Sequence, residues 1–507
     1  MSAHGIACAA RRAAAALALL AAGALAAPAA RAQDAPALLA RRAILELELD
    51  TAAHILELAS SGVGEDVERA RLAVYRGDCD EAVRLLARPE MEHDEGGASL
   101  IGVARGCARG TAATVTLTDE AAGVTVRFQD DEDMALFPIL VTTAVAARDM
   151  LARELETEMP RPLRIDLVRD QFTLAALSGL PERAAQTTGA VAVAKYGRVL
   201  MVSPRAASHG YPWLDTLTHE LTHLAIARKS ADRAPLWLQE GVAKRQETRW
   251  RPAEPLDDVP SYDAIAAVGM QRGLGVRLDE IGPSIAMLPS AEQAGVAFAQ
   301  VTSFIRFLLR ESGDAALPRL LATMRDALPT GDVVDGALKL TTGKTLKEWD
   351  ARWRADLARK TYELAPDEQP GADVPEAAPY GKKLRLAELL RERGHPDQAA
   401  KVARDAHLLL PAEAAARAEL ALALIAAGRK DEAAPYVSDV TELHGQTGRW
   451  WSLHALLHGD PDGTARARAL AREPLSAAVA CEELAPPELP KDPARAAVCA
   501  AARRVPR

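Results

Sequence analysis

Hydrophobic and polar positions follow two different periods along the chain. A period of two, typical of half-buried strands, appears in short segments between residues 114 and 202. Gly123 and the Tyr196-Gly197 pair interrupt these segments and predict tight turns, so we expect two hairpins with a separate strand between them. The predicted strands are 114–117, 124–128, 163–168, 190–194 and 199–202.

Helical patterns occupy most of the remaining chain and predict helices within 38–108, 134–158 and 213–360. Aromatic residues make up only 4% of the sequence, and the abundant alanine and leucine favour helices that pack closely on small side chains. The predicted fold class is therefore mainly α. It includes one α+β unit, in which a small mixed sheet is followed by a helical subdomain, and an α-helical repeat tail.

The C-terminal part of the chain carries an internal repeat. A segment rich in proline, glycine and acidic residues, 363–381, is expected to be a linker. Beyond it the repeat has a period of 34 residues, seen in the pairs Ala387 and Ala421, Gly394 and Gly428, Asp397 and Asp431, Ala399 and Ala433. The period and the small residues resemble tetratricopeptide repeats, and a plain helical bundle is the alternative. In either case residues 382–507 are expected to dock a protein partner or act as a spacer.

A single copy of a similar pattern occurs earlier in the chain, where Gly77 and Ala82 lie five residues apart. We therefore expect a helical N-terminal region over residues 33–110 with one tetratricopeptide-like hairpin. Residues 111–362 then form the central unit, which contains all of the predicted strands.

The first 32 residues are typical of a cleavable export signal. Arg11 and Arg12 precede an apolar run, 13–27, and Ala30-Arg31-Ala32 supplies a small-x-small cleavage site. This predicts a periplasmic or secreted mature protein, with a mitochondrial-type presequence or a buried helix as the alternative. No later stretch reaches the roughly 18 uninterrupted apolar residues of a membrane helix, so no stable membrane span is expected after cleavage.

Charge and cysteine content narrow the function classes. The net charge of -9 becomes -12 without the three arginines of the signal, which argues against nucleic-acid binding. Four cysteines remain after cleavage, and an even count in an exported chain suggests disulfides. Proximity favours the pairs Cys79–Cys107 and Cys481–Cys499, with four separate thiols as the alternative. A cysteine zinc site is not expected, because no Cys-x-x-Cys pair is present.

The segment 214–225 contains the pattern His219-Glu220-x-x-His223. On a helix the two histidines are one turn apart and face the same way, so both imidazoles can reach one metal ion. Glu220 is rotated by about 100° from His219 and can reach a water molecule at that metal. A stripe of leucines is predicted to anchor the opposite side of the helix in a core: Leu214, Leu217, Leu221 and Leu224.

A catalytic zinc site usually has three protein ligands and a water molecule, so a third ligand is needed. Glu240 is the candidate, because it lies in the apolar helical segment 235–243, where an unpaired carboxylate would be costly. The polar segment 228–233 is able to turn the chain back and bring two helices face to face.

With these residues the sequence resembles the gluzincins, the thermolysin-like zinc metallopeptidases. More narrowly, residues 112–358 resemble bacterial peptidase MA-like domains, which carry a second motif like Trp237-Leu238-Gln239-Glu240-Gly241-Val242-Ala243. The resemblance implies a zincin-type catalytic unit, with Zn²⁺ held by His219, His223 and Glu240 and with Glu220 as general base. It also implies that an edge strand near 190–194 aligns an extended peptide by strand addition.

The sequence departs from the gluzincin pattern at two places. Four residues after the third ligand, where an acidic residue often supports a histidine, the chain has Lys244, and Asp215 is a candidate substitute. Phe298, at the expected position of an oxyanion-stabilising side chain, has no hydroxyl group. The remaining candidates for that role are Tyr196, His209, Tyr211 and Tyr262.

The predicted function is exported, zinc-dependent hydrolysis of a peptide or protein substrate, in which Glu220 takes a proton from a zinc-activated water. The alternative is a non-proteolytic protein, in which the zinc fold is a scaffold and the repeats recruit envelope partners. A third reading is metal-dependent hydrolysis of a non-peptide bond.

Overall fold

The computed structural model describes residues 35–180, 190–206, 210–254, 257–282, 285, 288–327, 332–364, 368–371, 374–411, 413–438, 448–474, 481 and 488–504. The proposed signal, 1–32, lies outside these residues. The chain divides into two compact units, one ending at Arg109 and the other beginning at Gly110. Most described residues are helical, and a small mixed sheet lies in the second unit, so the mainly α prediction is confirmed at this level.

The first unit is a group of short helices with a core of its own. Gly77, with φ of 80°, ends α4 in the left-handed conformation that glycine adopts readily. The Cys79–Cys107 disulfide joins α5 to α6, as sequence proximity favoured. The helices are α2 (Ala35–Leu45), α3 (Leu49–Leu58), α4 (Val63–Arg76), α5 (Cys79–Leu86) and α6 (Glu95–Thr111), with the 3₁₀ helix η1 (Pro89–His93) before α6.

The sheet of the second unit has five strands in the order β1-β2-β3-β5-β4. The two hairpin pairs β1–β2 and β4–β5 are antiparallel, whereas β2–β3 and β3–β5 are parallel. Strand β4 therefore forms one edge of the sheet. The strands are β1 (Val115–Asp119), β2 (Val124–Phe128), β3 (Leu163–Val168), β4 (Ala192–Lys195) and β5 (Arg198–Val202), each within two residues of its predicted start.

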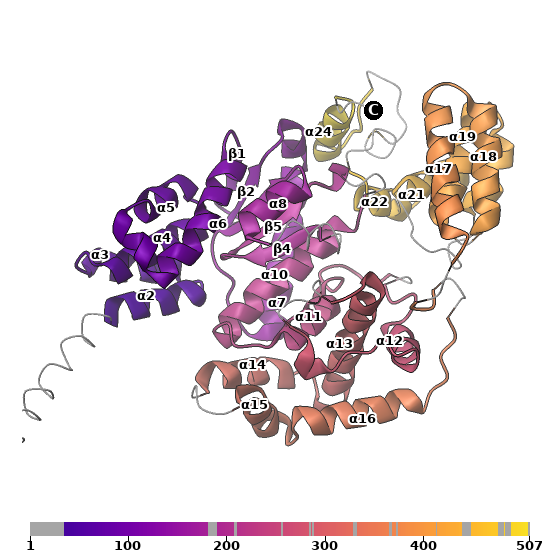
Figure 1. Cartoon of the computed structure of the whole chain (residues 1–507). Coiled ribbons are helices and arrows are strands. Elements are labelled where there is room, and N and C mark those ends of the chain that lie inside the picture. The colour runs from indigo at the N-terminus through magenta and orange to yellow at the C-terminus, as the bar shows by residue number, and fades with distance from the viewer. Residues whose placement is uncertain are drawn as a thin grey trace, which may run out of the picture. The chain divides into compact units, whose positions relative to one another are not determined.

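Helices cover both faces of the sheet (Figure 1). Leu200 and Val202 of β5 share an apolar cluster with Leu174 and Leu177 of α8 (Gln171–Ser178). Alternate residues of a strand face opposite sides, so the other face meets α7 (Phe137–Leu155) and α10 (Trp213–Ser230), which contact the sheet and each other.

One described segment, Asp131–Leu155, is long and apolar enough to cross a membrane by length and composition alone. It comprises the 3₁₀ helix η2 (Asp131–Leu136) and α7. Helix α7 packs against α10 and the sheet and buries Ala144, Ala147 and Leu151. We therefore interpret the segment as a core helix.

A helical subdomain follows the sheet. Helix α11 (Leu236–Gln246) packs between α10 and α13. Near its start the ring of Trp237 meets Phe304 edge to face, and Phe304 meets Trp353 in the same way. The other helices are α12 (Tyr262–Gln271), α13 (Ala291–Ser312), α14 (Ala316–Asp326), α15 (Val333–Thr342) and α16 (Leu346–Ala358), with the 3₁₀ helix η4 (Leu278–Glu280) between α12 and α13.

The tail consists of helices (Figure 1). Alanines make up much of their core, as the composition predicts. The Cys481–Cys499 disulfide holds the last helix, again as proximity favoured. The elements are α17 (Ala377–Glu392), α18 (Pro396–Leu409), α19 (Ala414–Ala426), α20 (Lys430–Ala433), η6 (Ala434–Val437), α21 (Gly448–His458), α22 (Thr464–Leu470) and α24 (Pro493–Ala502).

Candidate metal centre

Helix α10 is buried on one side and partly exposed on the other. Its leucine stripe is buried, with Leu217 and Leu221 fully inaccessible, and Trp213 at its first turn is also fully buried. The side chains of His219 and His223, on the opposite side, keep 12% and 14% of their surface exposed. The helix therefore presents both imidazoles from a rigid support, as the spacing predicts.

Helix α11 brings Glu240 to the histidines. Helix α10 ends at Ser230, and Ala231 and Asp232 adopt positive φ values that reverse the chain before α11 begins. Gly241, which follows Glu240 in α11, lies against α13. A Cβ atom at Gly241 would be only 2.5 Å from the Val301 carbonyl oxygen. This close contact fixes α11 on the side that meets α13, so that Glu240, on the other side, faces α10.

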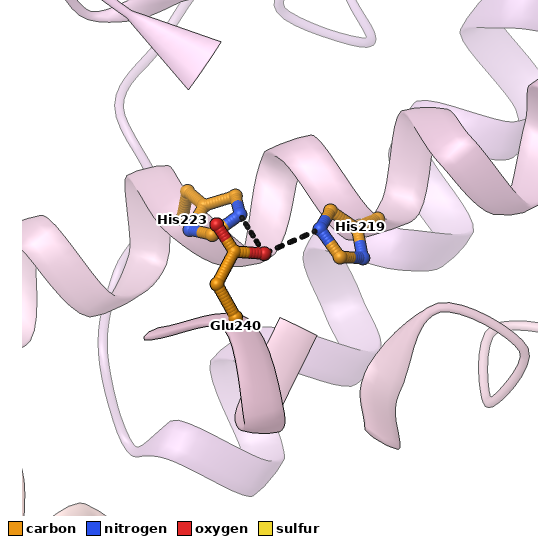
Figure 2. Close-up of side chains that lie close together, drawn as sticks. All are labelled: His219, His223 and Glu240. Atoms are coloured by element: carbon orange, nitrogen blue, oxygen red, sulfur yellow. Dashed lines mark ion pairs between the residues drawn. The ribbon is translucent and has the colours of Figure 1, made fainter. Parts of the chain in front are cut away.

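The three predicted ligands converge (Figure 2). One carboxylate oxygen of Glu240 lies 3.4 Å from His219 Nε2 and 3.7 Å from His223 Nε2. One donor atom from each of the three residues lies within 4.8 Å of the others. Two imidazoles and one carboxylate are a donor set that zinc uses in catalytic sites, and the residues present therefore fit such an ion.

Glu220 lies beside this cluster and is 7% exposed. Its Oε2 accepts a hydrogen bond of 2.6 Å from the backbone N–H of Ala194, in the edge strand β4. Burial raises the pKa of Glu220, and the charges of the nearby histidines oppose that shift. The carboxyl group of Glu220 thus joins the candidate metal centre to the edge of the sheet.

The partner of the first histidine is Glu247, which the sequence reasoning missed. Its Oε2 lies 3.2 Å from His219 Nδ1, and Lys244 Nζ contacts the same carboxylate at 2.8 Å. Glu247 follows Glu240 by seven residues, close to two helical turns, so both carboxylates lie on one side of α11. That spacing is the signal that would have found it.

Asp215 does not take the supporting role considered for it. Its carboxylate accepts hydrogen bonds of 2.8 Å from Trp250 Nε1 and from Arg251 Nη2. Asp215 therefore ties the start of α10 to the segment after α11, and Lys244, where an acidic residue was expected, instead neutralises Glu247.

The carboxylates also determine the protonation of His219. Burial lowers the pKa of His219, but its hydrogen bonds to Glu240 and Glu247 outweigh burial and raise the pKa to about 10. A cation placed among these groups would satisfy the same negative charges that now favour the proton. Metal binding and protonation are therefore expected to compete at this site.

The residues considered for oxyanion stabilisation lie in different surroundings. Tyr211 donates its hydroxyl hydrogen to the Val202 carbonyl at 2.5 Å. The ring of Tyr262 lies beneath the Lys244 ammonium group, with 5.8 Å between the ring centroid and Nζ. Tyr196 occupies the turn between β4 and β5, Phe298 lies in α13, and His209 is outside the described residues.

Comparison with known proteins provides a family match for the tail. A search of curated proteins finds no match to the chain. Residues 390–457 match the family model of the tetratricopeptide repeat, over the helices in which the 34-residue period was found. The repeat prediction is confirmed for this region, which is similar to tetratricopeptide repeats.

Proposed function

We propose that the chain is an exported zinc-dependent metallopeptidase of the gluzincin type. The observation that carries the proposal is the convergence of His219, His223 and Glu240, with Glu220 next to them. The resemblance of the same motifs to peptidase MA-like domains supports a zincin-type unit over residues 111–362.

The roles of the residues follow from their positions. His219, His223 and Glu240 would hold Zn²⁺, which when bound polarises a scissile carbonyl and lowers the pKa of a water ligand. Glu220 accepts the proton of the attacking water and passes it to the leaving amine. Glu247 holds His219 through Nδ1, which leaves Nε2 directed at Glu240.

An extended peptide or protein segment is the substrate that the surroundings favour. Strand β4 is the edge of the sheet, and α10 with Glu220 lies directly against it. An edge strand offers backbone hydrogen-bonding groups that recognise the main chain of an extended peptide, whatever its side chains. Substrate addition to β4 would bring a peptide bond next to Glu220.

The disulfides support the proposed location. Cys79–Cys107 and Cys481–Cys499 are both formed, and structural disulfides persist in oxidising compartments. A periplasmic or secreted enzyme agrees with that chemistry and with the signal-like residues 1–32.

A non-proteolytic scaffold is the second candidate. The tetratricopeptide match over residues 390–457 favours it, because such repeats commonly bind protein partners. Under this proposal the metal site is structural and the repeats carry the function.

Metal analysis combined with peptide cleavage tests the two proposals. We expect about one zinc per mature chain and cleavage of a quenched fluorescent peptide library that a chelator abolishes. Glu220→Gln should keep the zinc and lower the cleavage rate by at least about 100-fold, because it removes the general base. Glu292→Gln, at an exposed position of α13, is the matched control and should cleave normally.

The outcomes separate the candidates. Zinc binding with no cleavage, combined with recovery of a partner through the repeats, would favour the scaffold. Unchanged cleavage by Glu220→Gln would overturn the proposed mechanism.

A further inference from the structure

The β4–β5 hairpin determines which backbone groups of β4 face outward. Tyr196 and Gly197 form a two-residue turn, with φ of 53° and 70°, between the facing residues Lys195 and Arg198. In such a hairpin hydrogen-bonded and non-hydrogen-bonded pairs alternate away from the turn. The bond from Val202 N–H to the Val191 carbonyl, 2.7 Å, agrees with that alternation.

Two residues of β4 thus direct both backbone groups away from β5. Ala194, opposite Val199, and Ala192, opposite Met201, occupy the non-hydrogen-bonded positions. Val193, between them, pairs with Leu200 and directs its N–H into the sheet. The outer edge of β4 therefore offers an N–H and a carbonyl from each of these two alanines.

The outward N–H of Ala194 already donates a hydrogen bond within the chain. The Ala194 N–H donates to Glu220 Oε2 at 2.6 Å. Glu220 is nearly inaccessible to solvent, and a buried carboxylate needs hydrogen bonds to replace its lost hydration. Within the described part of the chain, the outward N–H and carbonyl of Ala192 make no such bond.

We propose that the edge strand has a divided role, in which the Ala194 N–H positions Glu220 and the outward N–H and carbonyl of Ala192 bind the substrate main chain. The inference rests on the proposed peptidase function. It makes Ala194 a positioning residue that acts through its backbone, and it limits strand addition to peptides that present both an N–H and a carbonyl opposite Ala192.

The division has a physical reason. A carboxylate that removes a proton from water must keep one oxygen directed at that water. The Ala194 N–H holds Oε2 of Glu220, so the carboxyl group cannot rotate freely and its other oxygen keeps a defined direction. The donor is a backbone group of the strand that binds substrate. The same strand therefore positions both the base and the peptide.

Amide-to-ester substitution tests the proposal with little change in shape. Lactic acid incorporated at position 194 replaces the N–H by an ester oxygen and keeps the side chain. We expect kcat to fall by about 10- to 100-fold with KM nearly unchanged, the effect of losing a hydrogen bond to a charged group. The same substitution at position 192 is the matched control, and should raise KM while kcat is largely retained.

Hydrogen exchange resolved to single residues tests the geometry without using activity. The Ala194 amide should exchange slowly in the wild-type chain and at least about tenfold faster in Glu220→Ala, because its acceptor is gone. Glu220→Gln keeps an acceptor oxygen and should retain part of the protection. The amide of Val193, bonded to β5, should stay protected in every variant.

The results distinguish failure of this inference from failure of the proposed function. Chelator-sensitive cleavage that depends on Glu220 but is unaffected by the ester at 194 would overturn the inference and leave the peptidase standing. Equal exchange at Ala194 with and without the Glu220 carboxylate would also overturn it, whether or not any peptide is cleaved.

Discussion

At the residue scale, the acidic side chains around α10 and α11 differ in role because they differ in partner. Glu240 faces both candidate histidine ligands, Glu247 contacts the far nitrogen of one of them, and Asp215 binds Arg251. All three are partly buried carboxylates of similar chemistry. Their neighbours distinguish the proposed metal ligand, the carboxylate that contacts a histidine ligand and the carboxylate that stabilises the fold.

Replacing Glu247 should therefore weaken metal binding without unfolding the chain. Glu247→Gln keeps the size of the side chain but loses the charge that acts on His219 Nδ1, and we expect zinc affinity to fall by about 10- to 100-fold. Competition titration against a chromophoric chelator would measure the zinc affinity of the variant and of the wild-type chain.

Asp215→Asn is the control for this prediction. It should lower thermal stability, because Arg251 loses a charged partner, and leave zinc affinity within about twofold. The opposite pattern in the two variants would show that Asp215, and not Glu247, supports the metal site.

Asp133 gives the chain a predictable dependence on pH. It is fully inaccessible, and burial raises its pKa to about 6 although Arg205 and Ser203 oppose the shift. The folded state thus holds this proton more tightly than the unfolded state does. The stability from Asp133 is fully present below its ordinary pKa of 3.8 and is lost as the pH rises through about 6.

Denaturation at a series of pH values measures the pH dependence of stability that Asp133 is expected to cause. Relative to Asp133→Asn, the free energy of unfolding of the wild-type chain should fall between about pH 4 and pH 6, by at most about 1.4 kcal/mol per pH unit. Parallel pH profiles for the two proteins would contradict the shift at Asp133.

The residues of the site were predictable to the extent that helix geometry is regular. The four-residue spacing of His219 and His223 is enough to predict a shared helix face, and the structure brings Glu240 beside them. The seven-residue spacing from Glu240 indicates the side of α11 on which Glu247 lies. It does not determine the contact with His219, because Glu247 lies just past the end of the helix, where a side chain's reach depends on how the helix terminates. The hydrogen bond from Ala194 to Glu220 joins residues of a strand and a helix, and local pattern does not determine that contact.

At the element scale, glycine determines how closely α11 approaches α13. A Cβ at Gly241 would lie 2.5 Å from the Val301 carbonyl oxygen and 2.6 Å from Ile305 Cγ1. Gly241→Ala should therefore push the helices apart and cost about 1–3 kcal/mol of unfolding free energy. Because Glu240 is the preceding residue, zinc affinity should fall as well.

A second glycine provides the comparison. Gly295 lies within α13 with no atom within 4 Å of the Cβ position, so Gly295→Ala should stabilise the chain by about 0.5–1 kcal/mol through helix propensity. Thermal unfolding of both variants measures the difference. Equal effects would show that the close approach at Gly241 does not limit the packing of α11.

The strands were predictable individually, and their order was not. Period-two alternation and turn residues located β1 to β5, since these signals are local. The placement of β5 between β3 and β4, with two parallel pairs, depends on contacts between residues distant in sequence. The edge position of β4, on which the proposed substrate binding depends, was expected from the family resemblance and not from local pattern, and the strand order of the structure agrees with it.

At the scale of the whole molecule, the second unit extends beyond the strands and the candidate metal centre into the tail. Arg468 of α22 forms an ion pair of 3.0 Å with Glu254, close to the segment that holds Asp215. Gly210, just before α10, lies so close to Arg472 that a Cβ atom would collide with the Arg472 carbonyl oxygen. The α22 segment of the tail thus packs against residues just before and after the two helices of the candidate site.

A double-mutant cycle measures that contact in solution. Arg468→Ala, Glu254→Ala and the double variant should give a coupling energy of up to about 1 kcal/mol in unfolding free energy, as expected for a partly exposed pair. Chemical denaturation followed by tryptophan fluorescence provides the values. A coupling near zero would mean that α22 does not rest on this segment.

The candidate ligands, the proposed base and Glu247 all lie within residues 219–247, on two consecutive helices. An ion held there would close only a short loop, and short loops cost little entropy to close. The α10–α11 pair is thus a self-contained chelator, whereas the sheet edge that supplies Ala194 must be assembled from distant parts of the chain. Under the proposed function, metal retention and catalytic competence are therefore separable: a partly unfolded chain would keep a bound Zn²⁺ after losing the strand that orients the proposed base.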